Sequence, residues 1–135
     1  MVEAVAGHTN CTLTDSDVLA LLQDGATTRS SILATLQGLS VAGVPNGTQL
    51  VDALERAMRY SIDADEAYQQ WVLNTPQYSY GSGIAYCPPP QNGEYSFDRA
   101  QALSESASSA KQEFVAIWNP LAVELGLRVF SEEDL

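Results

Sequence analysis

The sequence predicts an all-α fold: an antiparallel bundle of three main helices plus a short C-terminal helix, with one long loop tethered by a disulfide. Three observations lead to this prediction. Apolar residues recur at intervals of three and four over three long segments, which is typical of helices with one buried face. Segments rich in proline, glycine and asparagine separate them, as expected for turns. No segment alternates apolar and polar residues as a half-buried strand does.

The first predicted helix covers residues 15–40. Thr14 is suited to cap its first turn, and Asp15 and Asp17 favour the positive end of the helix dipole. Arg29 interrupts an otherwise apolar face, so its charge needs a partner within the bundle. The other members of this face are Val18, Leu22, Gly25, Ile32, Leu36 and Leu39.

Residues 1–13 are expected to form a polar tail in front of a single helical domain of residues 14–135. His8, the only histidine, lies in this tail and is expected to be solvated. Zinc sites that use histidine, serine triads and cysteine–histidine pairs are therefore excluded unless His8 folds back into a site. No catalytic residue, metal or cofactor is predicted.

The second predicted helix runs from Thr48 to Asn74, between a turn at 41–47 and Thr75-Pro76, which disfavours helical backbone. Asp65 lies at the margin of its apolar face, where a carboxylate needs a partner. Because Arg29 can supply that partner, we expect a structural Arg29–Asp65 ion pair; the alternative is an Asp65 that faces solvent. The face itself consists of Leu50, Leu54, Ala57, Ser61, Ala64, Tyr68 and Trp71.

The third predicted helix begins after Ser96, which can cap it, and has Asp98 in its first turn. Asn119-Pro120 is expected to end it and to start the short fourth helix, with the asparagine as cap and the proline in the first position. Gly126 then ends the fourth helix. The apolar face of the third helix is Ala100, Leu103, Ala107, Ala110, Phe114 and Ile117.

The long loop of residues 75–95 is the most informative surface that the sequence predicts. Tyrosine and tryptophan combine an apolar ring with a polar tip, which suits contact with sugars and peptides. The alternative is that these side chains fold back over the open end of the bundle. The candidate ligand-binding residues are Trp71, Tyr78, Tyr80, Tyr86 and Tyr95.

Cys11 and Cys87 are the only cysteines, and they form either a disulfide or two separate thiols. Both lie in polar loop segments, whereas a free cysteine usually behaves as a small buried hydrophobe. Antiparallel helices also bring the loop after the second helix to the end of the bundle where Cys11 lies. A Cys11–Cys87 disulfide is therefore favoured, and it indicates an oxidising, extracytoplasmic compartment.

The excess of acidic side chains and the short apolar runs restrict the partners that the sequence predicts. The 135 residues carry six basic and seventeen acidic side chains, a net charge of −11. Nucleic-acid binding needs a basic face, so no nucleic-acid partner is predicted. Because no apolar run approaches the roughly 20 residues that span a bilayer, this part of the chain is not expected to insert into a membrane.

Two sequence patterns carry a resemblance to a family. The first is Leu50-x3-Leu54-x2-Ala57-x3-Ser61-x3-Asp65-x2-Tyr68-x2-Trp71, and the second is Ala110-Lys111-x2-Phe114-x3-Trp118-Asn119-Pro120-x-Ala122-x3-Gly126-Leu127. Together they resemble uncharacterised helical extracytoplasmic domains of secreted or membrane-anchored actinobacterial proteins. The resemblance implies a location in the cell envelope, on the outer face of the membrane or beyond it, and implies no catalytic activity.

These observations predict a non-enzymatic extracytoplasmic interaction or sensing domain of the bacterial cell envelope, whose partner is an unknown protein or cell-wall ligand. The alternative is a module that binds cell-wall glycan or peptide through the tyrosine-rich loop. A third hypothesis is an enzyme that works with carboxylates alone, which requires facing carboxyl groups about 5–10 Å apart in a cleft.

Overall fold

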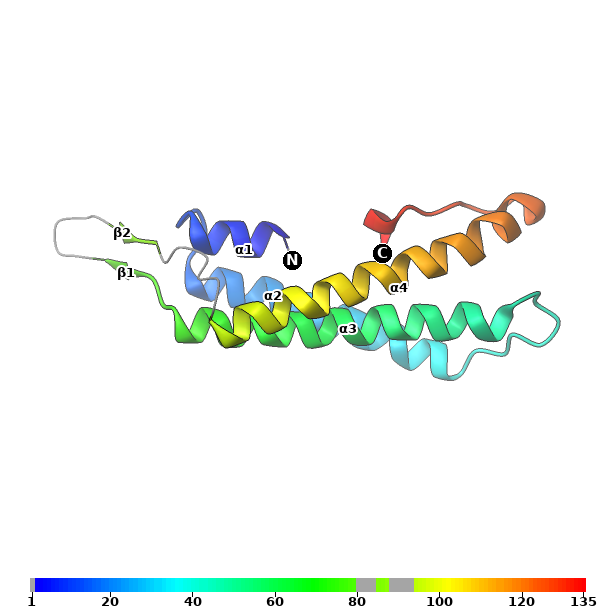
Figure 1. Cartoon of the computed structure of the whole chain (residues 1–135), viewed down its shortest axis with the longest axis horizontal. Helices are drawn as coiled ribbons and strands as arrows, with labels where there is room; N and C mark the ends of the chain where they lie inside the picture. The colour runs from blue at the N-terminus through cyan, green and yellow to red at the C-terminus, as the bar shows by residue number, and fades with distance from the viewer. Residues whose placement is uncertain (1, 80–84, 88–93) are drawn as a thin grey trace.

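The computed structural model describes residues 2–79, 85–87 and 94–135, and it has the predicted all-α bundle architecture (Figure 1). Three long helices form the bundle, and a two-stranded hairpin projects from one of its ends. In chain order the elements are α1 (Val2–Thr9), α2 (Asp15–Gln37), α3 (Gly47–Asn74), β1 (Tyr78–Ser79), β2 (Ala85–Tyr86), α4 (Tyr95–Leu125) and the 3-10 turn η1 (Glu132–Asp134).

The α2 helix begins with the predicted cap at Thr14. The Thr14 hydroxyl accepts a hydrogen bond from the backbone N–H of Asp17 at 3.2 Å, and the Asp17 carboxylate accepts one from the Thr14 backbone N–H at 3.2 Å. This reciprocal pair satisfies two backbone donors that the first turn of a helix leaves free. The helix then continues without a break through Gly25 to Gln37.

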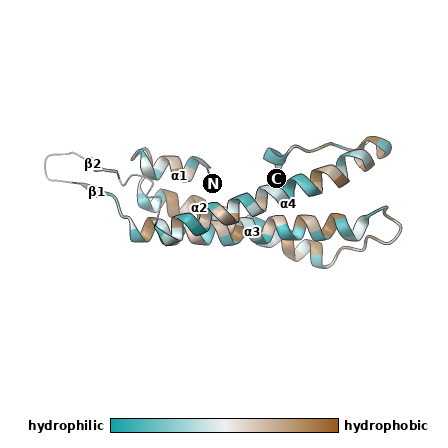
Figure 2. Ribbon diagram, in the orientation of Figure 1, coloured by the Kyte–Doolittle hydropathy of each residue, from teal (hydrophilic) through white to brown (hydrophobic). Residues whose placement is uncertain are grey.

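The central helix is α3, which packs against α2 along one side and against α4 along another. Apolar and polar residues alternate around each long helix in Figure 2, as the sequence periodicity predicts. The interior has an apolar cluster at each end and an alanine-rich section between them. Small side chains in that middle section, such as Ala57 and Ala110, let the helices approach closely.

The proline in α4 does not divide the helix, so the predicted short fourth helix is absent from the described residues. The α4 helix passes through Pro120 and ends at Gly126, whose left-handed backbone (φ 65°) suits a glycine cap. Asn119 cannot act as a helix cap here because its side chain is engaged elsewhere. It donates to the Phe130 carbonyl at 2.9 Å and accepts from the Phe130 N–H at 3.0 Å.

The predicted N-terminal tail is wrong in its main feature, because residues 2–9 form the helix α1. Ala4 is buried in the same apolar cluster as residues of α2, α3 and α4. Gly7 allows the next segment to fold back closely, since a Cβ atom there would lie 2.5 Å from a methyl carbon of Leu13. His8, expected to be solvated, is completely buried.

Candidate functional site

The hairpin of β1 and β2 brings two of the predicted tyrosines together. Tyr78 and Tyr86 are direct partners in the antiparallel register, so their side chains leave the same face of the hairpin with Cβ atoms about 4.5–5.5 Å apart. Their side chains are 56% and 44% exposed. Because the hairpin extends beyond the bundle (Figure 1), this pair does not cover the open end of the helices.

The other candidate residues of the loop have different positions. Tyr95 is the exposed first residue of α4, and Tyr80 lies outside the described residues. Trp71 is completely buried, so its prediction as a surface ligand contact is wrong. It belongs instead to the aromatic core, where its ring centroid lies 5.0 Å from that of Phe97 and 4.6 Å from that of His8.

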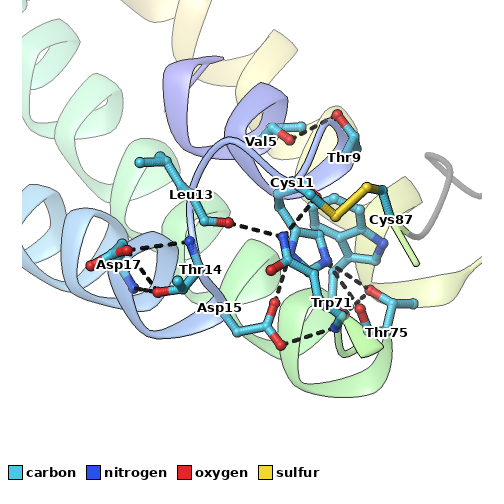
Figure 3. A network of polar contacts seen from close by, with 12 residues as sticks. Val5, Thr9, Cys11, Leu13, Thr14, Asp15, Asp17, Trp71, Thr75 and Cys87 are labelled. Atoms are coloured by element: carbon cyan, nitrogen blue, oxygen red, sulfur yellow. Dashed lines mark hydrogen bonds and ion pairs between the residues drawn. A yellow bond between two sulfur atoms is a disulfide. The ribbon is translucent and has the colours of Figure 1, made fainter. Parts of the chain in front are cut away.

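The predicted disulfide fixes the second end of the hairpin. Cys87 directly follows β2 and is bonded to Cys11, with a Cα–Cα separation of 5.5 Å, within the usual range for disulfides. Cys11 lies between α1 and α2, so the bond joins the hairpin to the start of the bundle (Figure 3).

A partly buried polar network fixes the first end of the hairpin through Gln77, the residue before β1. The backbone N–H of Gln77 donates to the Asp15 carboxylate at 3.0 Å. Its side-chain amide donates to two backbone carbonyls, those of His8 at 2.9 Å and Leu13 at 3.0 Å. Three hydrogen bonds therefore hold the residue next to Tyr78 against the segment that joins α1 to α2.

His8 is the centre of this network and is flanked by acceptors on both sides. Its Nε2 lies 3.0 Å from the Thr75 carbonyl oxygen, and its Nδ1 lies 3.0 Å from a carboxylate oxygen of Asp15. The Nδ1 contact with Asp15 is one of proximity, because the two atoms are not aligned as a hydrogen bond.

The described hairpin residues carry no charged side chain, in a protein whose net charge is −11. The paired tyrosines thus offer a neutral surface of two aromatic rings with hydroxyl tips, and both ends of the hairpin are held in place. A surface whose base is already fixed loses less conformational entropy when a ligand binds. This arrangement is suited to binding.

Sequence reasoning missed the role of His8, Asp15 and Gln77. One available signal is the disulfide prediction itself, since a bond from Cys11 to Cys87 brings residues 8–15 beside the chain that leaves α3 at Thr75. A lone histidine one helical turn after Ala4 is a weaker signal, because it places both residues on one face of a short helix.

The predicted Arg29–Asp65 ion pair is present in the middle of the bundle, with 2.6 Å between Nη1 and Oδ2. Asp65 is buried, and this burial raises the pKa of its carboxyl group, while the positive charges of Arg29 and, more weakly, Lys111 oppose the rise. Gly25 makes room for the pair on α2. Since Asp65 is enclosed and paired, it has the structural role that the sequence predicts.

Among the described residues, no group of three or more histidine, cysteine, aspartate or glutamate side chains is placed to hold a metal ion. Within the same part of the chain, no helix has both the length and the apolar character needed to cross a membrane. Comparison of the chain with protein-family models, curated proteins and solved structures finds no match.

Proposed function

We propose that this chain is a non-enzymatic interaction domain of the bacterial cell envelope, which binds its partner through the tyrosine hairpin, meaning residues 77–79 and 85–87. The observation that carries the proposal is the exposed cross-strand pair of Tyr78 and Tyr86 on a hairpin fixed at both ends. Tyrosine supplies a large contact area at a low cost in side-chain entropy, which is why it is common in binding surfaces.

The Cys11–Cys87 bond supports an extracytoplasmic location for this activity, because disulfides persist in oxidising compartments and are rare in the cytosol. The bond also has a direct part in the proposed function. Without it, the contacts that hold the hairpin within the described part of the chain would be those of Gln77 at one end, and a ligand would have to order the other end.

A second candidate function is binding of cell-wall glycan or peptide by the same tyrosines. The observation that favours it is the neutral character of the described hairpin residues. Sugars and short peptides present mixed apolar and hydroxyl or amide surfaces, which match an aromatic ring with a polar tip. A strongly basic protein partner would be drawn to the acidic helices instead.

Co-sedimentation tests both candidates with two preparations: actinobacterial cell envelopes that retain their proteins, and peptidoglycan purified from them. The double variant Tyr78→Ala/Tyr86→Ala removes both rings, and Tyr60→Ala is the matched control because Tyr60 is a partly exposed tyrosine on α3, away from the hairpin. We expect the double variant to lose binding to envelopes, while the control variant binds like the unmodified protein.

Binding to purified peptidoglycan that is also lost in the double variant supports the second candidate. Binding to envelopes alone supports a protein or other envelope partner. Equal binding by the double variant, or no binding of the unmodified protein to either preparation, contradicts the use of the hairpin as a binding surface.

A further inference from the structure

A surface pocket lies beside Lys111 of α4, the only lysine of the chain. The C-terminal segment forms its other wall, because the chain turns back after Gly126 and places η1 against α4 (Figure 1). On η1, the Glu132 carboxylate accepts a hydrogen bond from the side chain of Gln112, the neighbour of Lys111, at 2.9 Å. The pocket has a volume of about 580 Å³, which is in the range of small-molecule sites. Its lining residues are Lys111, Ser131, Glu132 and Glu133.

The Lys111 side chain is partly buried at this pocket and has no fixed partner. Within the described part of the chain it makes no ion pair and no hydrogen bond, whereas Arg29, Arg56, Arg59 and Arg128 each contact a carboxylate. Its amine can therefore meet a ligand in the pocket without first breaking a salt bridge.

The charged groups that face Lys111 come from three elements: Arg29 from α2, Asp65 from α3 and Glu132 from η1. Burial, and then the positive charge of Arg29, lowers the pKa of Lys111, while Glu132 and Asp65 oppose the change. More of this amine is therefore unprotonated at neutral pH than in a solvated lysine. Burial and a neighbouring cation are the two features that turn a lysine into a nucleophile.

We propose that Lys111 is a covalent modification site that captures small uncharged aldehydes at this pocket. The Nζ lone pair attacks the carbonyl carbon and forms a C–N bond. The carbonyl oxygen then leaves as water with the two hydrogens of the amine, and a C=N double bond, a Schiff base, remains, so no oxidant or reductant is consumed. Glu132 and Glu133 disfavour an anionic aldehyde, and the charge of Arg29 disfavours a cationic one.

Reductive trapping measures this reaction in the full chain. Glycolaldehyde is the uncharged probe, and glyoxylate, an anionic aldehyde of the same carbon number, is its control. Sodium cyanoborohydride fixes the Schiff base, and peptide mapping by mass spectrometry gives the labelling rate of Lys111. Each rate is divided by that of Nα-acetyl-lysine amide under the same conditions, which corrects for the intrinsic reactivity of each aldehyde.

We expect Lys111 in the folded protein at pH 7.5 to react with glycolaldehyde about fivefold or more faster than the model amide, and at the same rate as the amide in concentrated urea. The relative rate with glyoxylate should be at least threefold lower. The labelling rate plotted against pH should have its midpoint below 10.5, the ordinary pKa of a lysine. This pH profile requires no substitution, so it tests the proposal even if a variant of the pocket does not fold.

Glu132→Gln removes a negative charge that faces the amine, and should raise the labelling rate at pH 7.5 about twofold or more. Glu124→Gln is the control, because Glu124 is an exposed acidic residue of α4 outside the pocket, and it should leave the rate unchanged. Tyr78→Ala/Tyr86→Ala should also be labelled like the unmodified protein, which separates this proposal from the function of the hairpin.

Four results would overturn the proposal. Labelling of Lys111 no faster than that of the model amide, or equally fast in urea, would make it an ordinary surface lysine. A midpoint at or above that of the amide would show that the folded chain does not activate the amine. Equal relative rates for the two aldehydes would contradict the uncharged class of ligand. A Glu132→Gln protein labelled no faster than the unmodified one would show that the charges of the pocket do not control the reaction.

Discussion

At the scale of single residues, Gly25 is the position on α2 that leaves room for the buried Arg29–Asp65 ion pair. A Cβ atom at this position would lie 2.7 Å from Nη1 of Arg29 and 3.2 Å from a carboxylate oxygen of Asp65. The guanidinium is flexible enough to move, but moving it separates the pair and leaves Asp65 buried without its partner. Loss of a partner from a buried pair is strongly destabilising.

Gly25→Ala should therefore lower the free energy of unfolding by about 1–3 kcal/mol, although alanine favours a helix over glycine by roughly 1 kcal/mol. Urea unfolding followed by circular dichroism measures the change. Gly38→Ala is the control, because the nearest atom to its added Cβ is a backbone oxygen 3.8 Å away. A Gly25→Ala protein more stable than the unmodified one would contradict the close packing around the pair.

The same pair gives a prediction about pH. The pKa of Asp65 is raised by burial and is restrained by Arg29, so Arg29→Leu should raise it further. A carboxyl whose pKa is higher in the folded than in the unfolded state binds its proton more tightly when folded. Stability is therefore greater at low pH and is lost as pH rises through the folded pKa.

The destabilisation caused by Arg29→Leu should thus be small near pH 3 and grow to about 3–5 kcal/mol at pH 7. The increase begins near 3.8, the ordinary pKa of the group. Unfolding curves measured across this range test the prediction, and the double variant Arg29→Leu/Asp65→Asn should not show the increase. A penalty that is the same at pH 3 and pH 7 would argue that Asp65 does not carry the effect.

At the scale of elements, the position of the first end of the hairpin depends on Asp15, which contacts both His8 and Gln77. Asp15→Asn removes the charge that faces the His8 ring and weakens the acceptor for the Gln77 N–H. We expect faster hydrogen exchange at residues 77–79 and in α1, with little change in the middle of α3. Exchange measured by mass spectrometry gives this comparison.

Asp24→Asn is the control for that experiment, since Asp24 is an exposed acidic residue of the same helix. Unchanged exchange at residues 77–79 in the Asp15→Asn protein would mean that the disulfide alone holds the hairpin.

The elements also show where sequence reasoning succeeds. Periodicity identifies α2, α3 and α4 because each is long and buries one face, and Thr14 and Asp17 form a local cap that depends on no distant residue. The Arg29–Asp65 pair was predictable as well, because a charge on each of two apolar faces requires a partner.

What the sequence did not reveal depends on distant contacts. The α1 helix has eight residues, too few for a stable isolated helix, so it requires the core around Ala4. Local rules assign the Asn119 side chain to a helix cap before Pro120. In the structure this side chain instead bonds to the backbone of Phe130, eleven positions away, and α4 continues through Pro120. The pairing of Tyr78 with Tyr86 follows from the fixed ends of the hairpin, since strands of two residues carry no recognisable pattern.

At the scale of the whole molecule, the protein is a rod with a different surface at each end. The α3 helix has 28 residues and is about 42 Å long at 1.5 Å per residue. The tyrosine hairpin lies at one end, and an apolar groove lined by residues such as Leu36, Leu50 and Phe114 lies at the other.

The disulfide determines how much of this molecule stays ordered at the hairpin end. Closing a loop of this length is worth about 4–5 kcal/mol in the chain-entropy treatment, less any strain.

Reduction of the disulfide should lower the melting temperature and increase hydrogen exchange in residues 2–13 and 75–79 before it does so in α3 and α4. Both cysteines of the chain are in this bond, so the double variant Cys11→Ser/Cys87→Ser should reproduce the effect and be insensitive to reductant. A melting temperature unchanged by reduction would contradict this role.

The affinity of the unmodified protein for cell envelopes, compared with that of Tyr78→Ala/Tyr86→Ala, tests the central claim most directly. Both proteins should melt within about 2 °C of one another, because Tyr78 and Tyr86 are exposed residues and exposed substitutions usually change stability little. We predict that the double variant binds at least tenfold more weakly, and that Tyr60→Ala binds like the unmodified protein. Equal affinities of the unmodified protein and the double variant would show that the tyrosine hairpin is not the binding surface.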